Sequence, residues 1–262
     1  MPILLQRLAL TVMNIAIVGA GNIGHFLAHQ FAQAGHTIAH VVSRTESNAK
    51  FLAQKYTASF DTSLTTLSNQ IDLVCLTVPD DALLQLAFKT DAIVIHTSGA
   101  TDDNTISKFS ASTGCIWPVA SINKDSYTYM ENVPMCISSD NKDVQEILLK
   151  TCAAFTNKLY ALDSAQKKVA HLVATIGNNF CNHLLAEAHG ICYSKGIDPH
   201  MFLDLFAQPL AYFAQGSNEQ YQTGAARRKD VHTQETHLQL LADKPSMQEE
   251  YKLISKHISA KY

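Results

Sequence analysis

A glycine-rich stretch near the N-terminus, GAGNIG at residues 19–24, has the spacing G-x-G-x-x-G. It follows a β-branched apolar run and precedes a helical segment, which is the context in which such a turn binds a dinucleotide. There Gly19 permits the tight turn, Gly21 lets a pyrophosphate approach the backbone, and N–H groups at the helix start face the phosphates. We predict dinucleotide binding by Gly19, Gly21, Asn22, Ile23 and Gly24. A structural turn without a ligand is the alternative.

The end of the second predicted strand discriminates between the two dinucleotides. An NAD-binding domain usually carries an acid there, about 20 residues after the glycines, that bonds the ribose 2′-hydroxyl. Here the strand ends in Ser43, Arg44 and Thr45, and a guanidinium with two hydroxyls suits the 2′-phosphate of NADP. We predict NADP as the cofactor, and Glu46 keeps NAD as an alternative. The alternative for Arg44 is an ordinary solvated cation in a loop.

Two more strands end at the same edge of the predicted sheet, where the ligands of doubly wound sheets bind. Val78 and Pro79 follow one of these strands and are predicted to line the cofactor site. Thr97 and Ser98 follow the next strand, and they could hold the nicotinamide amide or a substrate carboxylate. An ordinary polar turn is the alternative for both, and Asp80 is predicted to cap the following helix.

The stretch KKVAHLVATIGNNFCNHLLAEAHG, residues 167–190, predicts a long helix with few charges and many neutral polar groups. At about 100° per residue, one stripe of this helix holds His171, Thr175, Asn178 and Asn182. A solvent face usually carries charges, whereas amides, hydroxyls and imidazoles suit a partly buried cleft in which each group finds a partner. We therefore favour a cleft, with a polar dimer seam and a plain solvent face as alternatives.

The opposite face of this helix is apolar, and we expect it to pack on another apolar surface. Its members are Val169, Val173, Ile176, Phe180 and Leu184. Across the chain only 16% of the residues are charged, which is below the roughly 25% of typical domains. Both observations indicate additional buried surface, and we predict a homodimer.

The remaining composition excludes several classes of function. The 262 residues can bury a sizeable core, and the net charge of −3 without a run of one sign gives no reason to expect a nucleic acid or an anionic membrane as partner. No segment has the roughly 20 apolar residues of a membrane span. Residues 1–13 lack the pattern of a signal peptide and are expected to be a poorly ordered extension.

The cysteines and histidines give no indication of a metal site. The six cysteines are scattered and contain no CxxC pair, as is typical of reduced core residues in a cytoplasmic protein. The pairs His25 with His29 and His232 with His237 lack a nearby acid in a metalloprotease pattern. We therefore predict a cytoplasmic protein without a metal ion.

The order of the predicted elements divides the chain in two. From residue 14 to about 162, strands and helices alternate, which predicts an α/β Rossmann domain with a doubly wound parallel sheet. No convincing strand follows, and residues 163–262 are predicted to form an all-α domain for substrate binding and dimerisation. Its helices are expected at residues 164–195, 199–215, 231–242 and 246–259.

Several of these motifs together resemble a family of NADP oxidoreductases in which a Rossmann domain precedes a helical DUF2520 domain. The resemblance rests on GAGNIG, the pair at Ser43 and Arg44, VPDD at 78–81 and HTSGA at 96–100. In the second half it rests on K-x-x-H-x(6)-N, at Lys168, His171 and Asn178, and on an R-x-D-x-x-T-x-x-x-H-L pattern that begins at Arg228. The fold of this family is similar to that of 6-phosphogluconate dehydrogenase, β-hydroxyacid dehydrogenases and pyrroline-5-carboxylate reductase.

The resemblance also implies site residues. In the similar dehydrogenases the first long helix after the Rossmann domain crosses the nicotinamide, which implies catalytic roles for Lys168, His171 and Asn178. His171 is the first choice as general acid, because an imidazole titrates near neutral pH. The implied substrate-binding residues are Ser98, Gly99, Thr175, Asn182 and Arg228.

The implied activity is hydride transfer between NADP and a small, carboxylate-bearing hydroxy, keto or imine compound. The alternative is a non-catalytic dinucleotide-binding sensor or regulatory protein. One departure keeps that alternative open: Trp117-Pro118 stands where the family is expected to have His-Pro.

Overall fold

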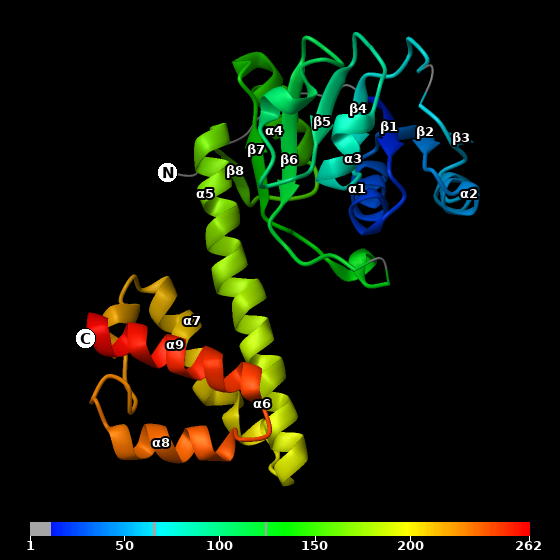
Figure 1. The fold of residues 1–262 in the computed structure, drawn as a ribbon. Coiled ribbons are helices and arrows are strands. Elements are labelled where there is room, and N and C mark those ends of the chain that lie inside the picture. Colours follow the sequence, from blue (N-terminus) through cyan, green and yellow to red (C-terminus); the bar gives the residue numbers. More distant parts are fainter. Residues whose placement is uncertain (1–11, 65–66, 124) are drawn as a thin grey trace. The chain divides into compact units, whose positions relative to one another are not determined.

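The computed structural model describes residues 12–64, 67–123 and 125–262. Residues 1–11, most of the predicted N-terminal extension, lie outside this range. The chain divides into two compact units, one that extends to Gly177 and one from Asn178 to Tyr262. The first carries a sheet with flanking helices, and the second carries helices α6 to α9 (Figure 1). Each unit is described by itself.

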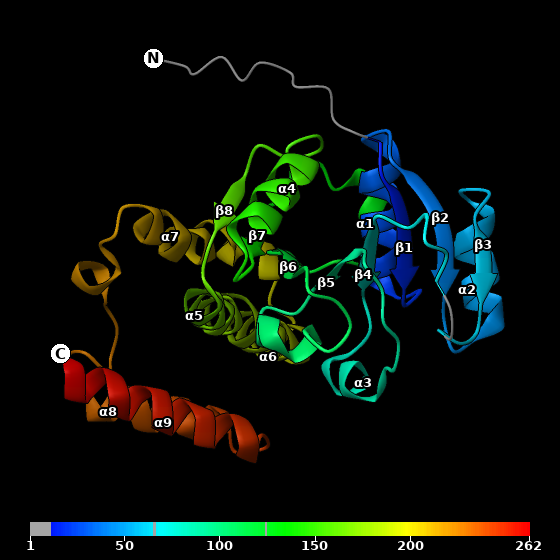
Figure 2. The same cartoon turned by 90° about the horizontal axis from the view of Figure 1, so that it is seen from above.

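The sheet of the first unit has eight strands in the order β3-β2-β1-β4-β5-β6-β7-β8, which Figure 2 shows side by side. Their bounds are β1 Asn14–Val18, β2 Thr37–Val42, β3 Ser59–Asp61, β4 Leu73–Leu76, β5 Ile93–His96, β6 Thr113–Pro118, β7 Met135–Ser138 and β8 Leu159–Ala161. Strands β1 to β6 are parallel, while β7 is antiparallel to β6 and β8 is parallel to β7. The predicted doubly wound Rossmann sheet is confirmed, with two reversed strands at one edge.

Both faces of the sheet are buried. Alternate residues of each strand point to opposite faces, so that each strand contributes side chains to two cores. Ile15 and Ile17 of β1 face one core, and Ala16 and Val18 face the other. The first core is completed by α1 (Asn22–Gln33), α2 (Glu46–Gln54) and α4 (Lys142–Cys152). The second is completed by α3 (Asp80–Gln85) and the 3₁₀-helix η1 (Asp103–Ile106). The two layers of helices hold the carboxyl ends of the strands in a fixed order.

Four local features of this unit differ from the prediction. Strand β3 was not expected, since its three residues contain a single apolar side chain. Helix α3 ends at Gln85, so the residues 86–88 that were predicted to continue it are not helical. The residue before α3 is Pro79, and Asp80 makes no capping bond. A short 3₁₀-helix, η2 (Tyr127–Tyr129), was also not predicted.

The described residues of the second unit form helices joined by turns, without a strand. Its elements are α6 (Cys181–Lys195), η4 (Pro199–Phe202), α7 (Leu203–Ala214), η5 (Asn218–Tyr221), α8 (Val231–Leu240) and α9 (Pro245–Lys261). Within the described residues the last strand ends at Ala161, next to the domain boundary predicted near residue 162. The compact units nevertheless divide later, at Gly177, because α5 (Ser164–Ala174) contacts the sheet through β7.

The long helix predicted for residues 164–195 is not a regular α-helix. Between α5 and α6 the segment Thr175–Phe180 is a π-helix. Its hydrogen bonds run from i to i+5, so residues after it are rotated from the positions of a 3.6-residue wheel. The stripe drawn from His171 to Asn182 therefore does not continue straight through this segment. Short π segments are frequent at functional sites.

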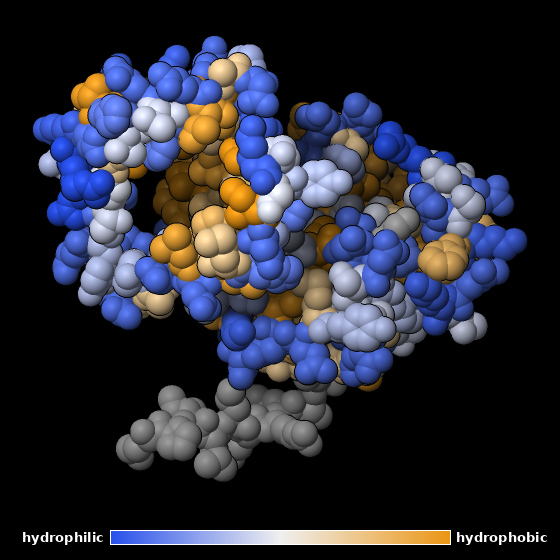
Figure 3. All heavy atoms as spheres, turned by 90° about the horizontal axis from the view of Figure 1, so that it is seen from below, coloured by the Kyte–Doolittle hydropathy of each residue, from blue (hydrophilic) through white to orange (hydrophobic). Residues whose placement is uncertain are grey.

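The apolar face of this helix is exposed in the single chain. Val169 is 61% exposed, Ile176 is 51% exposed and Phe180 is 57% exposed. Helix α7 of the second unit has no buried residue at all. Figure 3 shows apolar side chains, in orange, on the surface of the helical part of the chain. Among the described residues no helix is long and apolar enough to cross a membrane.

Candidate functional site

The turn between β1 and α1 requires glycine for steric reasons. Gly19 has φ +114°, and a Cβ atom on it would lie 2.6 Å from the carbonyl oxygen of Thr77. A Cβ atom on Gly24 would lie 2.0 Å from the carbonyl oxygen of Gly19. The Thr77 hydroxyl donates a hydrogen bond of 2.7 Å to that same oxygen. At Gly21, by contrast, a Cβ atom would meet nothing within 4 Å, so the space beside this residue is open to a ligand.

The open space is a cavity of about 590 Å³ at the carboxyl ends of β1, β2 and β4. Seven predicted cofactor-binding residues line it, namely Gly19, Gly21, Ser43, Arg44, Thr45, Val78 and Pro79. Asn22, Ile23 and Gly24 form the first turn of α1 behind them. Thr97 and Ser98 lie beyond the cavity, after the neighbouring strand β5.

The lining of this cavity fits NADP. The exposed Arg44 is its only charged residue among those that the structure describes, and none of them is acidic. Glu46, the residue that kept NAD as an alternative, belongs to the first turn of α2 and does not line the cavity. A guanidinium with the hydroxyls of Ser43 and Thr45 provides donors for a 2′-phosphate.

A hydrogen bond links this cavity to the loop that follows β5. The Ser98 hydroxyl donates to a carboxylate oxygen of Asp80 at 2.9 Å, and Asp80 directly follows the Pro79 that lines the cavity. The same hydroxyl accepts hydrogen bonds from the backbone N–H groups of Ala100 and Thr101. Asp80 is therefore an anchor for the loop and not the helix cap that the sequence suggests. Ser98 uses its hydroxyl to shape the turn that follows.

His171 lies against this loop and against Trp117. A Cβ atom on Gly99 would be 2.7 Å from Cδ2 of His171 and 2.8 Å from Cε2 of Trp117, so both rings pack directly on the glycine backbone. The two rings are 5.5 Å apart between centroids and inclined by 55°. His171 and Trp117 are both half-buried. The imidazole is thus packed on the loop that follows β5, the strand next to β4 in the sheet.

Lys167, which the sequence did not single out, is completely buried. Its Nζ donates to Asp103 Oδ1 at 2.5 Å and to the Thr101 carbonyl at 2.8 Å. His96 also lies in this cluster, with Nε2 3.1 Å from Asp103 Oδ1. Because Ser98 N–H donates to Nδ1 of His96, the proton of the neutral imidazole is on Nε2 and is donated to Asp103. Asp103 thus accepts from both His96 and Lys167.

The charges in this cluster follow from these bonds. Burial acts to raise the pKa of the Asp103 carboxyl, but hydrogen bonds from His96 and Lys167 outweigh it and lower this pKa to about 2. Burial lowers the pKa of His96, which keeps its imidazole neutral. We therefore assign a buried pair of one cation and one anion beside a neutral histidine.

A metal ion does not fit this cluster, although suitable ligand types meet there. Ligand atoms of His96, Asp103 and Cys115 lie within 4.8 Å of one another. The ammonium of Lys167 already provides the positive charge, and burial raises the pKa of Cys115 well above its usual value. A thiol held in its neutral form is a poor metal ligand.

The other predicted catalytic and substrate-binding residues have different surroundings. The exposed Lys168 pairs with Asp102 at 2.6 Å, and the Thr175 hydroxyl donates to the backbone of its own helix. Asn178, Asn182 and Arg228 belong to the second unit, where all three are exposed. Asn178 donates to the side chain of Asn179. The geometry of the first unit thus brings together Gly99 and His171 from the predicted set.

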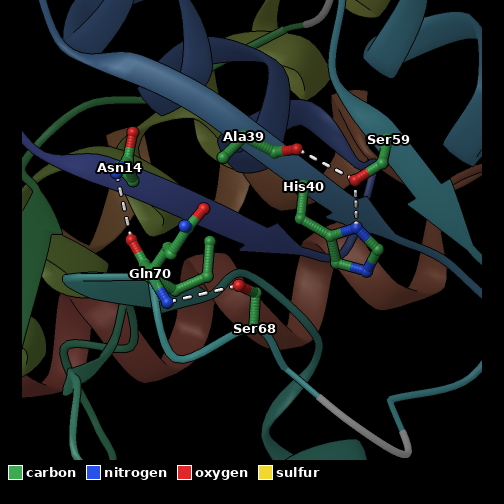
Figure 4. Close-up of a pocket in the computed structure, with 7 residues that line it drawn as sticks. Asn14, Ala39, His40, Ser59, Ser68 and Gln70 are labelled. Carbon is green, nitrogen blue, oxygen red and sulfur yellow. Dashed lines mark hydrogen bonds between the residues drawn. The ribbon is translucent and has the colours of Figure 1, made fainter.

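A second pocket, of about 380 Å³, lies near the start of β1 and not at the carboxyl ends of the strands (Figure 4). Ser59 and His40 line this pocket, and together with Asp61, which does not line it, they resemble a nucleophile, a base and an acid, with His40 Nδ1 2.7 Å from the Ser59 hydroxyl. The hydroxyl, however, donates its proton to the Ala39 carbonyl, so His40 must act as donor toward Ser59. This arrangement cannot activate the hydroxyl by removing its proton.

Two protein-family models match this chain, and the first of them describes NADP oxidoreductases, in agreement with the lining of the cavity. Residues 14–97 match the family model described as NADP oxidoreductase coenzyme F420-dependent, and residues 133–258 match DUF2520, a domain of unknown function. The chain is therefore similar to an NADP oxidoreductase family in its first part and to DUF2520 in its second part, as the sequence motifs predict. The second match begins at Val133, before the helical region. Among curated proteins, none matches this chain.

Solved structures share the fold over nearly the whole chain. A candidate NADP oxidoreductase from Bacteroides fragilis is 28% identical, with a TM-score of 0.83 over 95% of this chain and 98% of that one. A reductive aminase from Aspergillus terreus, in complex with NADPH and ethyl levulinate, is 15% identical, with a TM-score of 0.70 over 95% and 93%. A 1-pyrroline-5-carboxylate reductase from Streptococcus pyogenes is 12% identical, with a TM-score of 0.58 over 95% and 99%. At such identities the last two show similarity of fold alone.

The buried ion pair predicts a pH-dependent stability. An Asp103→Asn variant leaves Lys167 without its counter-ion, and we expect it to unfold with a free energy about 3 kcal/mol lower near pH 7. Because the Asp103 pKa is lowered to about 2 in the folded protein, its stabilisation is present above about pH 4 and is lost as the pH falls toward 2. Urea unfolding of both proteins between pH 7 and pH 3 measures the difference. Asp102→Asn, at the exposed pair, is the control, and a pH-independent difference would contradict the assignment.

Proposed function

We propose that this protein is an NADP-dependent oxidoreductase that reduces a small carbonyl or imine compound, or catalyses the reverse oxidation. The observation that carries this proposal is the chain of contacts from the glycine-turn cavity through Asp80 and Ser98 to Gly99 and His171. These contacts support the proposal, because they lead from a cavity whose lining suits the cofactor to an imidazole. When bound there, NADPH would supply the hydride.

His171 is the proposed proton donor. Its ring is half-buried against Gly99 and Trp117, so it is held in place and keeps one side open. Reduction of a carbonyl or imine leaves an oxygen or nitrogen that needs a proton, and an imidazole can deliver one near neutral pH. Lys168 remains the alternative donor, although its ammonium is engaged by Asp102.

The proposed substrate is a small compound with a carbonyl or imine group. A carbonyl or imine fits the proposed proton donor, whereas Gly99 is itself buried under the rings of His171 and Trp117. Binding of a substrate carboxylate by Arg228, and substrate contacts from Thr175, Asn178 and Asn182, remain predictions that follow from the family resemblance. A non-catalytic sensor has no support in the comparisons with known proteins.

We also propose that the protein is a homodimer located in the cytoplasm. Helix α7 exposes Leu203, Leu205, Leu210 and Phe213, each by more than half. Exposed apolar surface of this extent is typical of an interface with another protein chain, and a second copy is the simplest partner. All six cysteines are free, and five of them are buried, as is common in a reducing compartment.

The cofactor prediction is tested by titration with NADPH and NADH. We expect NADPH to bind at least about tenfold more tightly, because only NADPH carries the phosphate that Arg44 can bind. An Arg44→Ala variant should lose most of that preference while NADH affinity stays within about twofold. Lys50→Ala, an exposed cation on the neighbouring helix α2, is the matched control. Failure of the wild-type protein to bind either dinucleotide would refute the cofactor assignment.

The proposed proton donor is tested with His171→Gln, which keeps a polar side chain but cannot supply a proton. We expect turnover to fall by about 10²-fold or more, while NADPH affinity stays close to that of the wild type. NADPH oxidation is followed with keto acids, with ketones plus amines, and with coenzyme F420 as acceptors. His257→Ala, an exposed histidine on α9, serves as control. Equal turnover in His171→Gln and wild type would remove His171 from the reaction.

The dimer is tested by placing charges on α7. A Leu210→Glu, Phe213→Glu double variant should weaken association by at least about 100-fold, since each apolar side chain contributes roughly 1.5–3 kcal/mol when buried. Light scattering after size-exclusion chromatography reports the mass. Lys252→Glu, an exposed site on α9, controls for the change in charge. A wild-type chain that is monomeric at micromolar concentration would disprove the homodimer.

A further inference from the structure

Two adjacent lysines of α5 pair with two adjacent aspartates that follow β5. Lys167 Nζ lies 2.5 Å from Asp103 Oδ1, and Lys168 Nζ lies 2.6 Å from Asp102 Oδ2. Ser164, one turn earlier on α5, donates a hydrogen bond of 3.0 Å to Asp102. Three side chains at the beginning of α5 therefore bind the segment 101–103.

The two ion pairs differ in their surroundings. The side chains of Lys167 and Asp103 are 0% and 2% exposed, whereas those of Lys168 and Asp102 are 45% and 54% exposed. Burial of an ion pair involves a desolvation cost that its attraction often does no more than offset, so an apolar pair of similar volume would stabilise the fold as well. Stability alone does not explain why an ammonium occupies this interior position.

The same helix touches the loop a second time, four residues later. His171 follows Lys167 by about one turn, and residues i and i+4 share one face of a helix. Lys167 holds the loop at Thr101 and Asp103, while His171 packs on Gly99 of the same loop. The contact of His171 with Gly99 and Trp117 thus depends on where Lys167 holds the loop.

We propose that Lys167 is a positioning residue, whose buried ammonium fixes the loop 96–103 on α5 so that His171 keeps its place between Gly99 and Trp117. The ammonium supplies two donors that an apolar side chain lacks, one to the Thr101 carbonyl and one to Asp103. The 3.3 Å contact of Lys167 with His96 joins two donors and adds no bond. The role in turnover rests on the proposed function, whereas the geometric role does not.

The decisive variant is Lys167→Met with Asp103→Asn. It removes both charges together, keeps the volume of the side chains, and leaves an acceptor for His96 in the asparagine. Lys150→Met with Glu146→Gln removes another lysine–carboxylate pair, the exposed one on α4, and is the matched control. Lys167→Arg, which keeps a buried cation with a different shape, is measured beside them.

Two readouts are measured on each variant. The sequence contains one tryptophan, so intrinsic fluorescence and its quenching by acrylamide report on Trp117 alone. His171→Ala defines the signal without the neighbouring imidazole. The second readout is kcat and KM for NADPH, with whichever substrate the wild-type protein turns over.

If Lys167 positions the loop, the Met/Asn variant folds and unfolds cooperatively but its Trp117 signal moves toward that of His171→Ala. We expect kcat to fall about tenfold or more, as displacements of about 1 Å can cause, with KM for NADPH within about twofold. The control variant should match the wild type, and Lys167→Arg should lie between. A wild-type Trp117 signal in the Met/Asn variant overturns the proposal, and if that variant does not fold, a wild-type signal and kcat in Lys167→Arg overturn it.

Absence of turnover in the wild-type protein would count against the proposed function and not against the positioning role. The Trp117 signal requires neither cofactor nor substrate. It therefore decides the geometric role of Lys167 by itself.

Discussion

The interior ammonium of Lys167 imposes the constraint on which the rest of the site depends. A charge without exposure to water must find partners of fixed position, and Lys167 finds them in Thr101 and Asp103. This requirement leaves α5 little freedom to slide or rotate against the loop after β5. The position of His171, four residues further on, follows from it. A long-range ion pair thus places a side chain that local helix propensity alone could not place.

A second constraint, purely steric, acts at the other end of the site. Gly24 lies so close to the carbonyl of Gly19 that a Cβ atom on Gly24 would clash with it, so only glycine allows α1 to pack this closely on the turn. The cavity beside Gly21 results from this tight turn. The bond between Asp80 and Ser98 connects the two constraints. Cofactor cavity and imidazole are in this way fixed relative to each other within one compact unit.

The sequence predicts structural features whose pattern repeats over many residues. It does not predict the role of a side chain when that role depends on a single contact with a residue far away in the chain. Buried β-branched runs and the glycine spacing were enough to predict the sheet and the turn. No local pattern distinguishes Lys167 from Lys168, because the difference lies in which of them meets Asp103, more than 60 residues away. The role of Asp80 depends likewise on Ser98. The π segment and the three-residue strand β3 could not be predicted either. Their sequences have no periodicity that distinguishes them from an ordinary helix and a loop.

Trp117 bears on the choice between an enzyme and a sensor. Its indole has a single donor and no group that titrates in the physiological range, so it cannot replace a histidine in proton transfer. The Trp117 ring does, however, pack on Gly99 next to the His171 ring. Trp117 therefore cannot be the proton donor, and the donor that we propose is its neighbour His171, whose ring packs on the same glycine.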